Sequence, residues 1–299
     1  YKVTPNQAGT LSGADRFFLQ TILEAQDIRN SGWNYTDPNS KLTLSFYIKS
    51  NLTGIVSLEM NSPDSPSTKV HFRSTVTINS ANTWERKTVT ITGDSQLVFD
   101  DDNGSGLSIT WQYAAGPTFT SGTHVTGSWD TNAVAGNRSS SSNINIYSNT
   151  SNFVSLTGVQ LEVGEQATPF EHRSFAEELA RCQRYFQILS RNTSAGLNSH
   201  SRYPALGNGT NSTLWYCYHK QTMRVRPSLV TSNITSTTVE IFNYSTSGGA
   251  TYGGSSMSEG DENHSQITVT TTGGVSTGHV ACWRFKINGD CYWAVDSEL

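Results

Sequence analysis

Apolar and polar residues alternate along much of the chain, in short runs separated by turns rich in Asn, Ser, Pro and Gly. In the clearest run, KLTLSFYIKS over residues 41–50, every second position from Leu42 to Ile48 is apolar. Because successive side chains of a strand point to opposite faces, this pattern predicts a strand with one buried face. The same alternation predicts strands near residues 56–60, 70–72, 76–78, 89–91, 107–115, 144–147 and 159–163.

Many short strands separated by turns are typical of a β-sandwich, so we predict one jelly-roll domain over residues 1–171. A second β pattern follows a loop rich in Ser, Asn and Gly. Residues 214–218 are apolar at consecutive positions, which favours a central strand covered on both faces. With shorter runs between residues 230 and 295, this pattern predicts a smaller C-terminal β-sandwich over residues 191–299. The expected fold class is all-β.

A short connecting helix is predicted between these domains, within residues 172–190. Ser174 and Glu177 form a capping box, in which the Ser hydroxyl accepts from the backbone three residues later. The apolar residues that follow are spaced for one helical face of roughly four turns. Two interpretations of that face stay open: it packs on a neighbouring sheet, or it meets identical chains around a threefold axis. Its residues are Phe175, Leu179, Cys182, Tyr185 and Phe186.

Composition and charge narrow the function. The net charge is −4 and no run of Lys or Arg interleaves with aromatic residues, so nucleic-acid binding is not expected. No apolar segment approaches the roughly 20 residues that cross a bilayer, so we expect no membrane insertion. Because the chain starts at Tyr1, we expect that an N-terminal portion of a longer protein is missing.

The four cysteines are too sparse for a disulfide scaffold and have no C-x-x-C spacing. We expect free thiols, with a bridge between Cys282 and Cys291 left open. The motifs of serine hydrolases, zinc proteases, nucleotide-binding loops and dinucleotide folds are all absent, so we expect neither an enzyme nor a cofactor.

Aromatic residues in polar surroundings are the candidate ligand-binding residues, because sugar rings pack on aromatic faces while nearby polar groups bind hydroxyls. Trp33 with Asn34 and Trp129 with Asp130 lie in segments rich in Asn, Ser, Gly and Asp, where loops at the rim of a jelly roll would expose them. Tyr252 lies in the Gly- and Ser-rich segment 245–256, which we interpret as a recognition loop. The alternative for each is packing onto its own domain.

One acidic turn is a weak candidate for calcium. Asp100 and Asp102 precede Gly104, and alternate carboxylates before a glycine present oxygen ligands to calcium. The complete twelve-residue calcium loop is absent, and Asp-Asn-Gly is also an ordinary hairpin turn.

Several stretches resemble fibre and receptor-binding proteins of tailed bacteriophages, especially those of marine and environmental phages. The main one, GVQLEVGEQATPFEHRSFAEELARCQRYFQ over residues 158–187, joins a β-domain to a short helix. Residues 102–123, 223–228 and 296–299 support it. The resemblance implies a carbohydrate-binding-like jelly roll and a virion fibre protein, assembled in the host cytoplasm.

The resemblance also implies partners and a mechanism. We expect a homotrimer that binds host surface polysaccharide or lipopolysaccharide without cleaving it, attached to other virion proteins through the missing region. Three weak sites on one axis would add their affinities. Two alternatives stay open: a head fibre or capsid decoration, and a polysaccharide depolymerase, since paired catalytic carboxylates need no local motif.

Overall fold

The computed structural model describes residues 1–65, 70–131, 134–192, 203–208, 211–232, 239–243, 248–273, 275–277, 280–285 and 291–298. The chain divides into two compact units, residues 1–172 and 173–298. The sequence-based boundary between the first domain and the helix lies at residue 171. Each unit is considered separately below.

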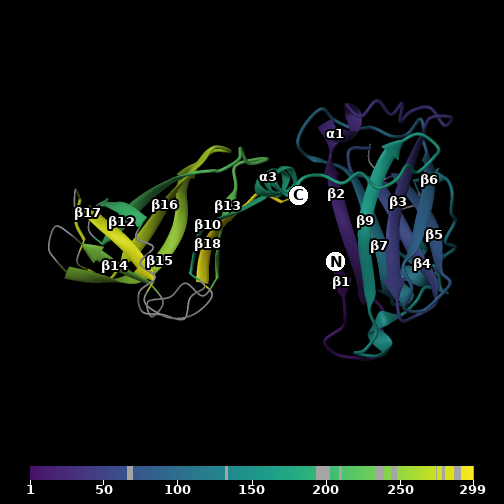
Figure 1. The fold of residues 1–299 in the computed structure, drawn as a ribbon, viewed down its shortest axis with the longest axis horizontal. Helices are drawn as coiled ribbons and strands as arrows, with labels where there is room; N and C mark the ends of the chain where they lie inside the picture. Colours follow the sequence, from purple (N-terminus) through teal and green to yellow (C-terminus); the bar gives the residue numbers. More distant parts are fainter. Residues whose placement is uncertain are drawn as a thin grey trace. The chain divides into compact units, whose positions relative to one another are not determined.

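The first unit consists of two facing antiparallel sheets (Figure 1). One has the order β1-β9-β3-β6 and the other β2-β7-β4-β5-β8, so successive strands mostly pass from one sheet to the other. This two-sheet order is that of a jelly roll, and the all-β fold class is confirmed. The strands are β1 (Lys2–Val3), β2 (Arg16–Glu24), β3 (Lys41–Ser50), β4 (Gly54–Ser62), β5 (Val70–Ile78), β6 (Glu85–Thr92), β7 (Ser105–Ala115), β8 (Trp129–Asp130) and β9 (Val154–Val163).

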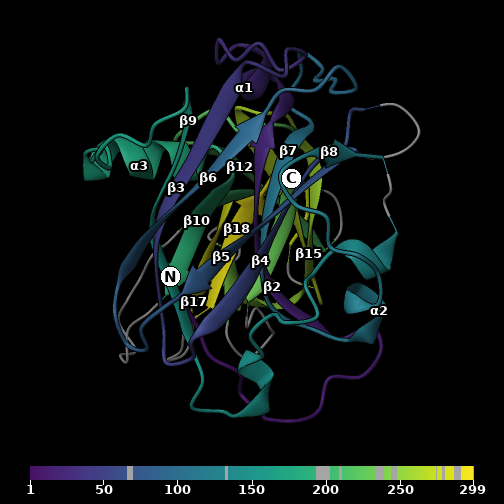
Figure 2. The same cartoon turned by 90° about the vertical axis from the view of Figure 1, so that its right-hand side faces the viewer.

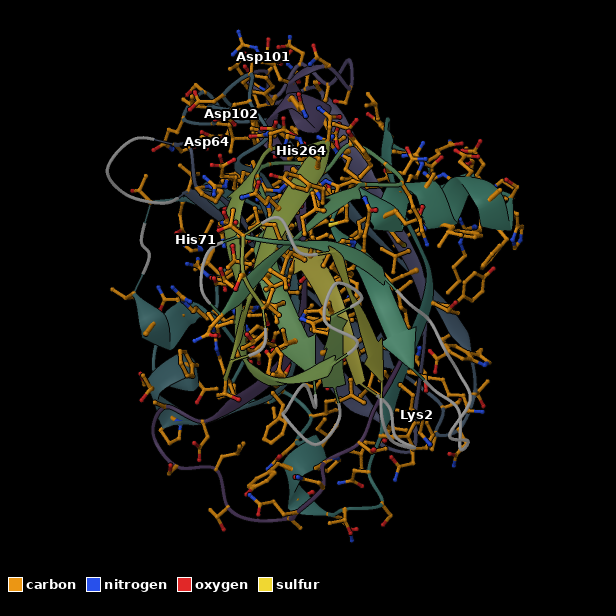
Figure 3. All side chains as sticks on the ribbon, turned by 90° about the vertical axis from the view of Figure 1, so that its left-hand side faces the viewer. Lys2, Asp64, His71, Asp101, Asp102 and His264 are labelled. Atoms are coloured by element: carbon orange, nitrogen blue, oxygen red, sulfur yellow. The ribbon has the colours of Figure 1, made fainter. Side chains whose placement is uncertain are left out.

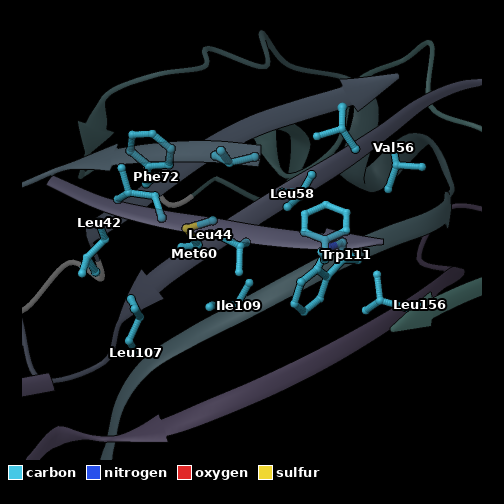
Figure 4. Close-up of a cluster of buried hydrophobic side chains, with 14 of the residues drawn as sticks. Leu42, Leu44, Val56, Leu58, Met60, Phe72, Leu107, Ile109, Trp111 and Leu156 are labelled. Atoms are coloured by element: carbon cyan, nitrogen blue, oxygen red, sulfur yellow. The ribbon is translucent and has the colours of Figure 1, made fainter. Parts of the chain in front are cut away.

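The core lies between the two sheets (Figure 4). Alternate residues of β3, including Leu44 and Phe46, are fully buried, as the alternation predicts. Trp111 of β7 meets Phe46 from the opposite sheet, with ring centroids 5.6 Å apart in an edge-to-face arrangement. Such aromatic pairs add stabilisation beyond the buried area alone.

A long connection covers the outer face of the five-stranded sheet. It runs from the end of β7 to β9 and carries the short helices α2 (Pro117–Thr120), η1 (Ala135–Asn137) and η2 (Ile146–Ser148). Figure 2 looks onto this unit, with α2 beside the sheet. Ser140 donates its backbone N–H to the Ser57 hydroxyl, and Arg138 lies 3.8 Å from the Glu59 carboxylate. Polar side chains that point away from the core are therefore buried as well. A fourth short helix, α1 (Ala25–Arg29), follows β2.

The second unit is also built of antiparallel strands. Six strands pair in a closed cycle in the order β11-β12-β16-β15-β14-β17, and three form a separate sheet, β10-β18-β13. Trp215, Ile267, Val269 and Trp293 are the larger buried residues of its core. The strands are β10 (Phe186–Asn192), β11 (Tyr203–Gly207), β12 (Ser212–Tyr218), β13 (Ser228–Ser232), β14 (Val239–Asn243), β15 (Gly248–Gly260), β16 (His264–Thr271), β17 (Val280–Phe285) and β18 (Cys291–Asp296).

The connecting helix is shorter than the sequence predicts. Helix α3 spans Phe175–Gln183, and the Ser174 hydroxyl accepts from the backbone N–H of Glu177 as expected for the cap. The predicted extension to residue 190 is wrong, because Phe186 and the residues after it pair with β18. Aromatic and branched residues favour a pleated strand, and this pairing satisfies their backbone groups. In the described ranges, no helix has the length and apolar character that crossing a bilayer requires.

Two adjacent residues of β3 test the assignment of inner and outer faces. Phe46→Ala should lower the free energy of unfolding by about 3–5 kcal/mol, because it removes a ring that is fully buried against Trp111. Tyr47→Ala should cost less than about 1 kcal/mol, because Tyr47 is 37% exposed on the opposite face. Urea denaturation followed by tryptophan fluorescence measures both. Equal losses would contradict the assignment.

Candidate functional site

A polar groove lies on the outer face of the five-stranded sheet, at the margin of the covering connection. Its volume is about 270 Å³ and it is partly open to solvent. The outward positions of β2, β4, β5 and β7 supply its floor, and the connection supplies Arg138. The polar side chains that line it include Arg16, Gln20, Asn61, His71, Ser108 and Arg138.

A buried ion contact lies beneath the groove. His71 Nδ1 is 2.9 Å from the Glu59 carboxylate, and both side chains are almost completely buried. The ring nitrogen that contacts the carboxylate is Nδ1, so Nε2 is the nitrogen left for other partners. A guanidinium also lies near Glu59, because Nε of Arg138 is 3.8 Å from its carboxylate. Glu59 therefore holds an imidazole and a guanidinium at the same edge of the groove.

A second ion pair lies farther along the same face. Arg73 of β5 is fully buried, and its Nη1 donates to the Asp130 carboxylate at 2.5 Å. Asp130 lies on β8 directly opposite His71 in the register. The two carboxylates of this face, Glu59 and Asp130, thus flank β5 on either side, and each contacts a cationic group.

Several buried polar atoms at the groove have no hydrogen-bond partner among the described residues. They are His71 Nε2, Ser108 Oγ and Arg138 Nε. An unsatisfied buried polar group costs about 1–3 kcal/mol, so such groups usually have a partner in the native state. All three atoms belong to residues that line the groove, whereas other such atoms belong to residues that do not line it.

An aromatic surface adjoins the groove. Phe18 of β2 points outward and is 41% exposed. The guanidinium of Arg16 lies 4.3 Å from the centroid of Phe18 and 4.9 Å from that of Phe119. Burial lowers the pKa of Arg16, the positive charge of Arg138 lowers it further, and Glu59 acts in the opposite direction. A polar groove with an aromatic rim matches the requirements of sugar binding.

The two tryptophans predicted as sugar platforms are buried instead. Trp33 is 3% exposed and packs edge-on against Tyr35 and near Phe99. Trp129 is 6% exposed, lies against Phe72 and donates its indole N–H to the Thr92 carbonyl at 2.6 Å. Their segments are polar in sequence, but the indoles fold onto the sandwich because burying so large an apolar area is favourable.

The polar residues predicted beside these tryptophans are placed differently. Asn34 is exposed, whereas the Asp130 carboxylate is the partner of Arg73. The structure does not bring Asn34 to the groove.

Tyr252 does not lie in a loop. It belongs to strand β15, pairs with Thr271 and is half-buried against Trp293, with ring centroids 6.5 Å apart. Its hydroxyl is 2.8 Å from Ser255 Oγ. The predicted recognition loop is therefore wrong over residues 248–256, because small residues also allow a strand to pack closely against its neighbours. Residues 245–247 lie outside the described residues.

The acidic turn has a structural role. The Asp102 carboxylate accepts the Gly104 N–H at 2.8 Å, which closes a local turn. Burial raises the pKa of the neighbouring Asp64, opposed by a backbone bond from Asp100 and reinforced by the charges of Asp100 and Asp102. Asp64, Asp101 and Asp102 gather at one end of the first unit (Figure 3). Among the described residues, no group of three or more His, Cys, Asp and Glu side chains could hold a metal.

The apolar stripe of α3 is exposed. Phe175 is 81% exposed, Leu179 is 42% exposed, and Cys182 is exposed as a free thiol. No residue of the helix is buried. Tyr185 and Phe186, which follow the helix, are half-buried. Within the second unit, the described residues therefore do not cover this face of the helix.

A second exposed aromatic surface lies on β12, and sequence reasoning missed it. Tyr216 and Tyr218 point outward and are 55% and 85% exposed, while the neighbouring Trp215 on the same strand is buried. Tyr218 lies near His264, with ring centroids 6.4 Å apart. We expected both faces of this strand to be covered, but only its inner face is.

The state of the cysteines is described only in part. The side chains of Cys282 and Cys291, between which a bridge was left open, lie outside the described residues. Cys217 is a free thiol, and burial raises its pKa to about 11.

No protein-family model matches the chain, and no curated protein does. Two solved structures show weak similarity. An exported protein of PBSX, XepA, has 9% identity and a TM-score of 0.23, with 99% of this chain and 86% of that chain covered. A putative secreted protein from Parabacteroides distasonis has 8% identity and a TM-score of 0.25, with 99% and 88% covered. At this level of similarity neither informs function.

The buried ion pair should be far more important for stability than a surface pair. Asp130→Asn should cost about 3 kcal/mol of unfolding free energy, the low end for a broken buried pair because Asp130 is itself 29% exposed. Glu165→Gln, which breaks an exposed contact with Lys41, should cost less than about 1 kcal/mol. Urea denaturation measures the difference. Indistinguishable values would show that Arg73 does not depend on Asp130.

Proposed function

We propose that this chain is the glycan-binding part of a phage virion fibre, which attaches to host surface polysaccharide or lipopolysaccharide without cleaving it. The observation that carries the proposal is the polar groove of the jelly roll, where His71 Nε2 and Ser108 Oγ are buried and have no partner in the part of the chain that the structure describes. The aromatic surface of Phe18 beside it supplies a contact for the apolar face of a sugar. The resemblance of residues 158–187 to phage fibre proteins supports the proposal that the chain is part of a virion fibre.

The proposal includes a homotrimer held through α3. Phe175, Leu179 and Cys182 share one face of the helix and are all exposed. Burying them against two copies removes apolar area from water and places three grooves on one particle. A single small groove binds weakly, and the effective concentration of linked sites raises the overall affinity.

A non-catalytic role is favoured over a depolymerase. A glycosidase needs one carboxylic acid that donates a proton and a second carboxylate across the sugar. On this face Glu59 is almost completely buried against His71, and Asp130 is paired with Arg73. Neither carboxylate is placed to meet a glycosidic bond in the groove. A head fibre or capsid decoration remains the alternative location, and labelled antibody on intact particles distinguishes it from the tail.

Sedimentation velocity tests the trimer. The native chain should sediment as three 32.7-kDa chains. Leu179→Glu should give monomers, because it places a charge in the centre of the apolar face. Arg181→Glu is the matched control, since Arg181 lies on the opposite side of the helix and is 60% exposed. A native monomer would refute the trimer, as would an unchanged trimer for Leu179→Glu.

Filling the groove tests glycan binding. Ser108→Leu replaces a hydroxyl that has no partner among the described residues by a larger apolar side chain at the groove floor, and thermal melting checks that the variant folds. Binding of labelled protein to an array of bacterial surface polysaccharides should fall about ten-fold or more. Thr90→Leu, an exposed change on the other sheet, should bind as the native chain does.

If the Ser108→Leu variant still binds polysaccharide as the native chain does, the groove is not the glycan-binding site. Release of new reducing ends from a bound polysaccharide would replace the non-catalytic role by a depolymerase.

A further inference from the structure

The charges around the groove do not balance. Two positively charged side chains, Arg16 and Arg138, line the groove. One carboxylate, that of Glu59, lies near Arg138. Arg73 and Asp130 neutralise each other nearby. Among the described residues, Arg16 forms no ion pair, so one positive charge remains beside the groove.

We infer that the groove binds a sugar that carries one negative charge, a uronate carboxylate or a sulfate ester, with Arg16 and Arg138 as its cationic contacts. This inference rests on the proposal that the groove binds glycan, and it names the class of glycan.

The two guanidiniums are placed to receive an anion. Arg16 lies over the rings of Phe18 and Phe119, and its guanidinium carries five N–H donors. Arg138 keeps a buried Nε–H without a hydrogen-bond partner, because 3.8 Å to Glu59 is too long for one. A guanidinium and a carboxylate or sulfate make two parallel N–H···O bonds, which are stronger than neutral hydrogen bonds.

An anion also relieves repulsion between the two arginines. Arg16 and Arg138 both line the groove, and the pKa of Arg16 is lowered first by its burial and then by the positive charge of Arg138. A monoanion cancels the single excess charge. A phosphate ester, with a charge of about −1.5 to −2, would overcompensate it.

Two polar groups are left to orient the sugar ring. Nδ1 of His71 contacts Glu59, so Nε2 is the ring nitrogen that is left for a sugar hydroxyl. Ser108 Oγ can donate or accept beside it. The volume of about 270 Å³ is below the ~300–1,000 Å³ of drug-sized sites, so it suits one sugar residue of a longer chain.

The test is NMR titration of the full chain with histidine side chains labelled, using four probes at equal ionic strength. They are methyl β-D-glucuronide, glucose 6-sulfate, the neutral methyl β-D-glucoside, and inorganic sulfate. The glucuronide, the sulfate ester or both should shift the His71 ring and bind about ten-fold more tightly than the neutral glucoside and inorganic sulfate. The two charged sugars distinguish a carboxylate from a sulfate ester.

Variants identify the contacts. Arg16→Gln and Arg138→Gln should each weaken the charged sugar about ten-fold and leave the neutral glucoside within about two-fold. Lys49→Gln removes one positive charge from β3 of the other sheet and should change neither probe. Thermal melting confirms that each variant folds.

The outcomes separate this inference from the proposed function. Equal binding of charged and neutral sugars overturns the anion but leaves a glycan groove. Inorganic sulfate as tight as the charged sugars also overturns it, because the groove then recognises an anion alone. If none of the four probes binds but Ser108→Leu still abolishes polysaccharide binding, the charged-sugar inference is overturned and the groove remains the glycan site. If no probe binds and Ser108→Leu leaves polysaccharide binding unchanged, both the charged-sugar inference and the glycan-binding groove are overturned.

Discussion

The burial of charge on the outer face of the five-stranded sheet is the constraint on which the first unit depends. Glu59, His71 and Arg73 point away from the apolar core, yet each is almost inaccessible to solvent. Buried charges are tolerated only when they are paired, so the covering connection and β8 must bring Arg138 and Asp130 to them. The same connection bounds the groove, because Arg138, which it carries to Glu59, is one of the residues that line it.

The strands of the sandwich were largely predictable, because their core-facing residues alternate with polar ones. Strand β3 has the predicted bounds, and the pattern around Trp111 correctly indicates burial. Strand β2 was not predicted, since its sequence RFFLQTILE lacks strict alternation. The helix was overextended because the periodicity of Tyr185 and Phe186 fits a helix as well as a strand, and long-range pairing with β18 decides between them.

The groove could not be derived from the sequence, because its residues come from four strands and a connection that the register alone brings together. Arg16 and Arg138 are 122 positions apart in the sequence and have no local motif. The aromatic residues that composition singled out, Trp33 and Trp129, fold inward because local polarity does not fix the direction of one side chain. In contrast, the face of α3 was predictable from spacing alone, since a capped helix orients its own residues.

The closed cycle of the second unit limits how that part of the molecule can recognise anything. In an open sheet the outermost strand offers free N–H and C=O groups, and an extended peptide or another copy can be added there by β-augmentation. The six strands of the cycle, which are β11, β12, β14, β15, β16 and β17, have no such outermost member, because each has a neighbour on both sides. Recognition by these strands must therefore run through side-chain chemistry on their outer surface, where Tyr216 and Tyr218 are the most exposed aromatic groups among the described side chains.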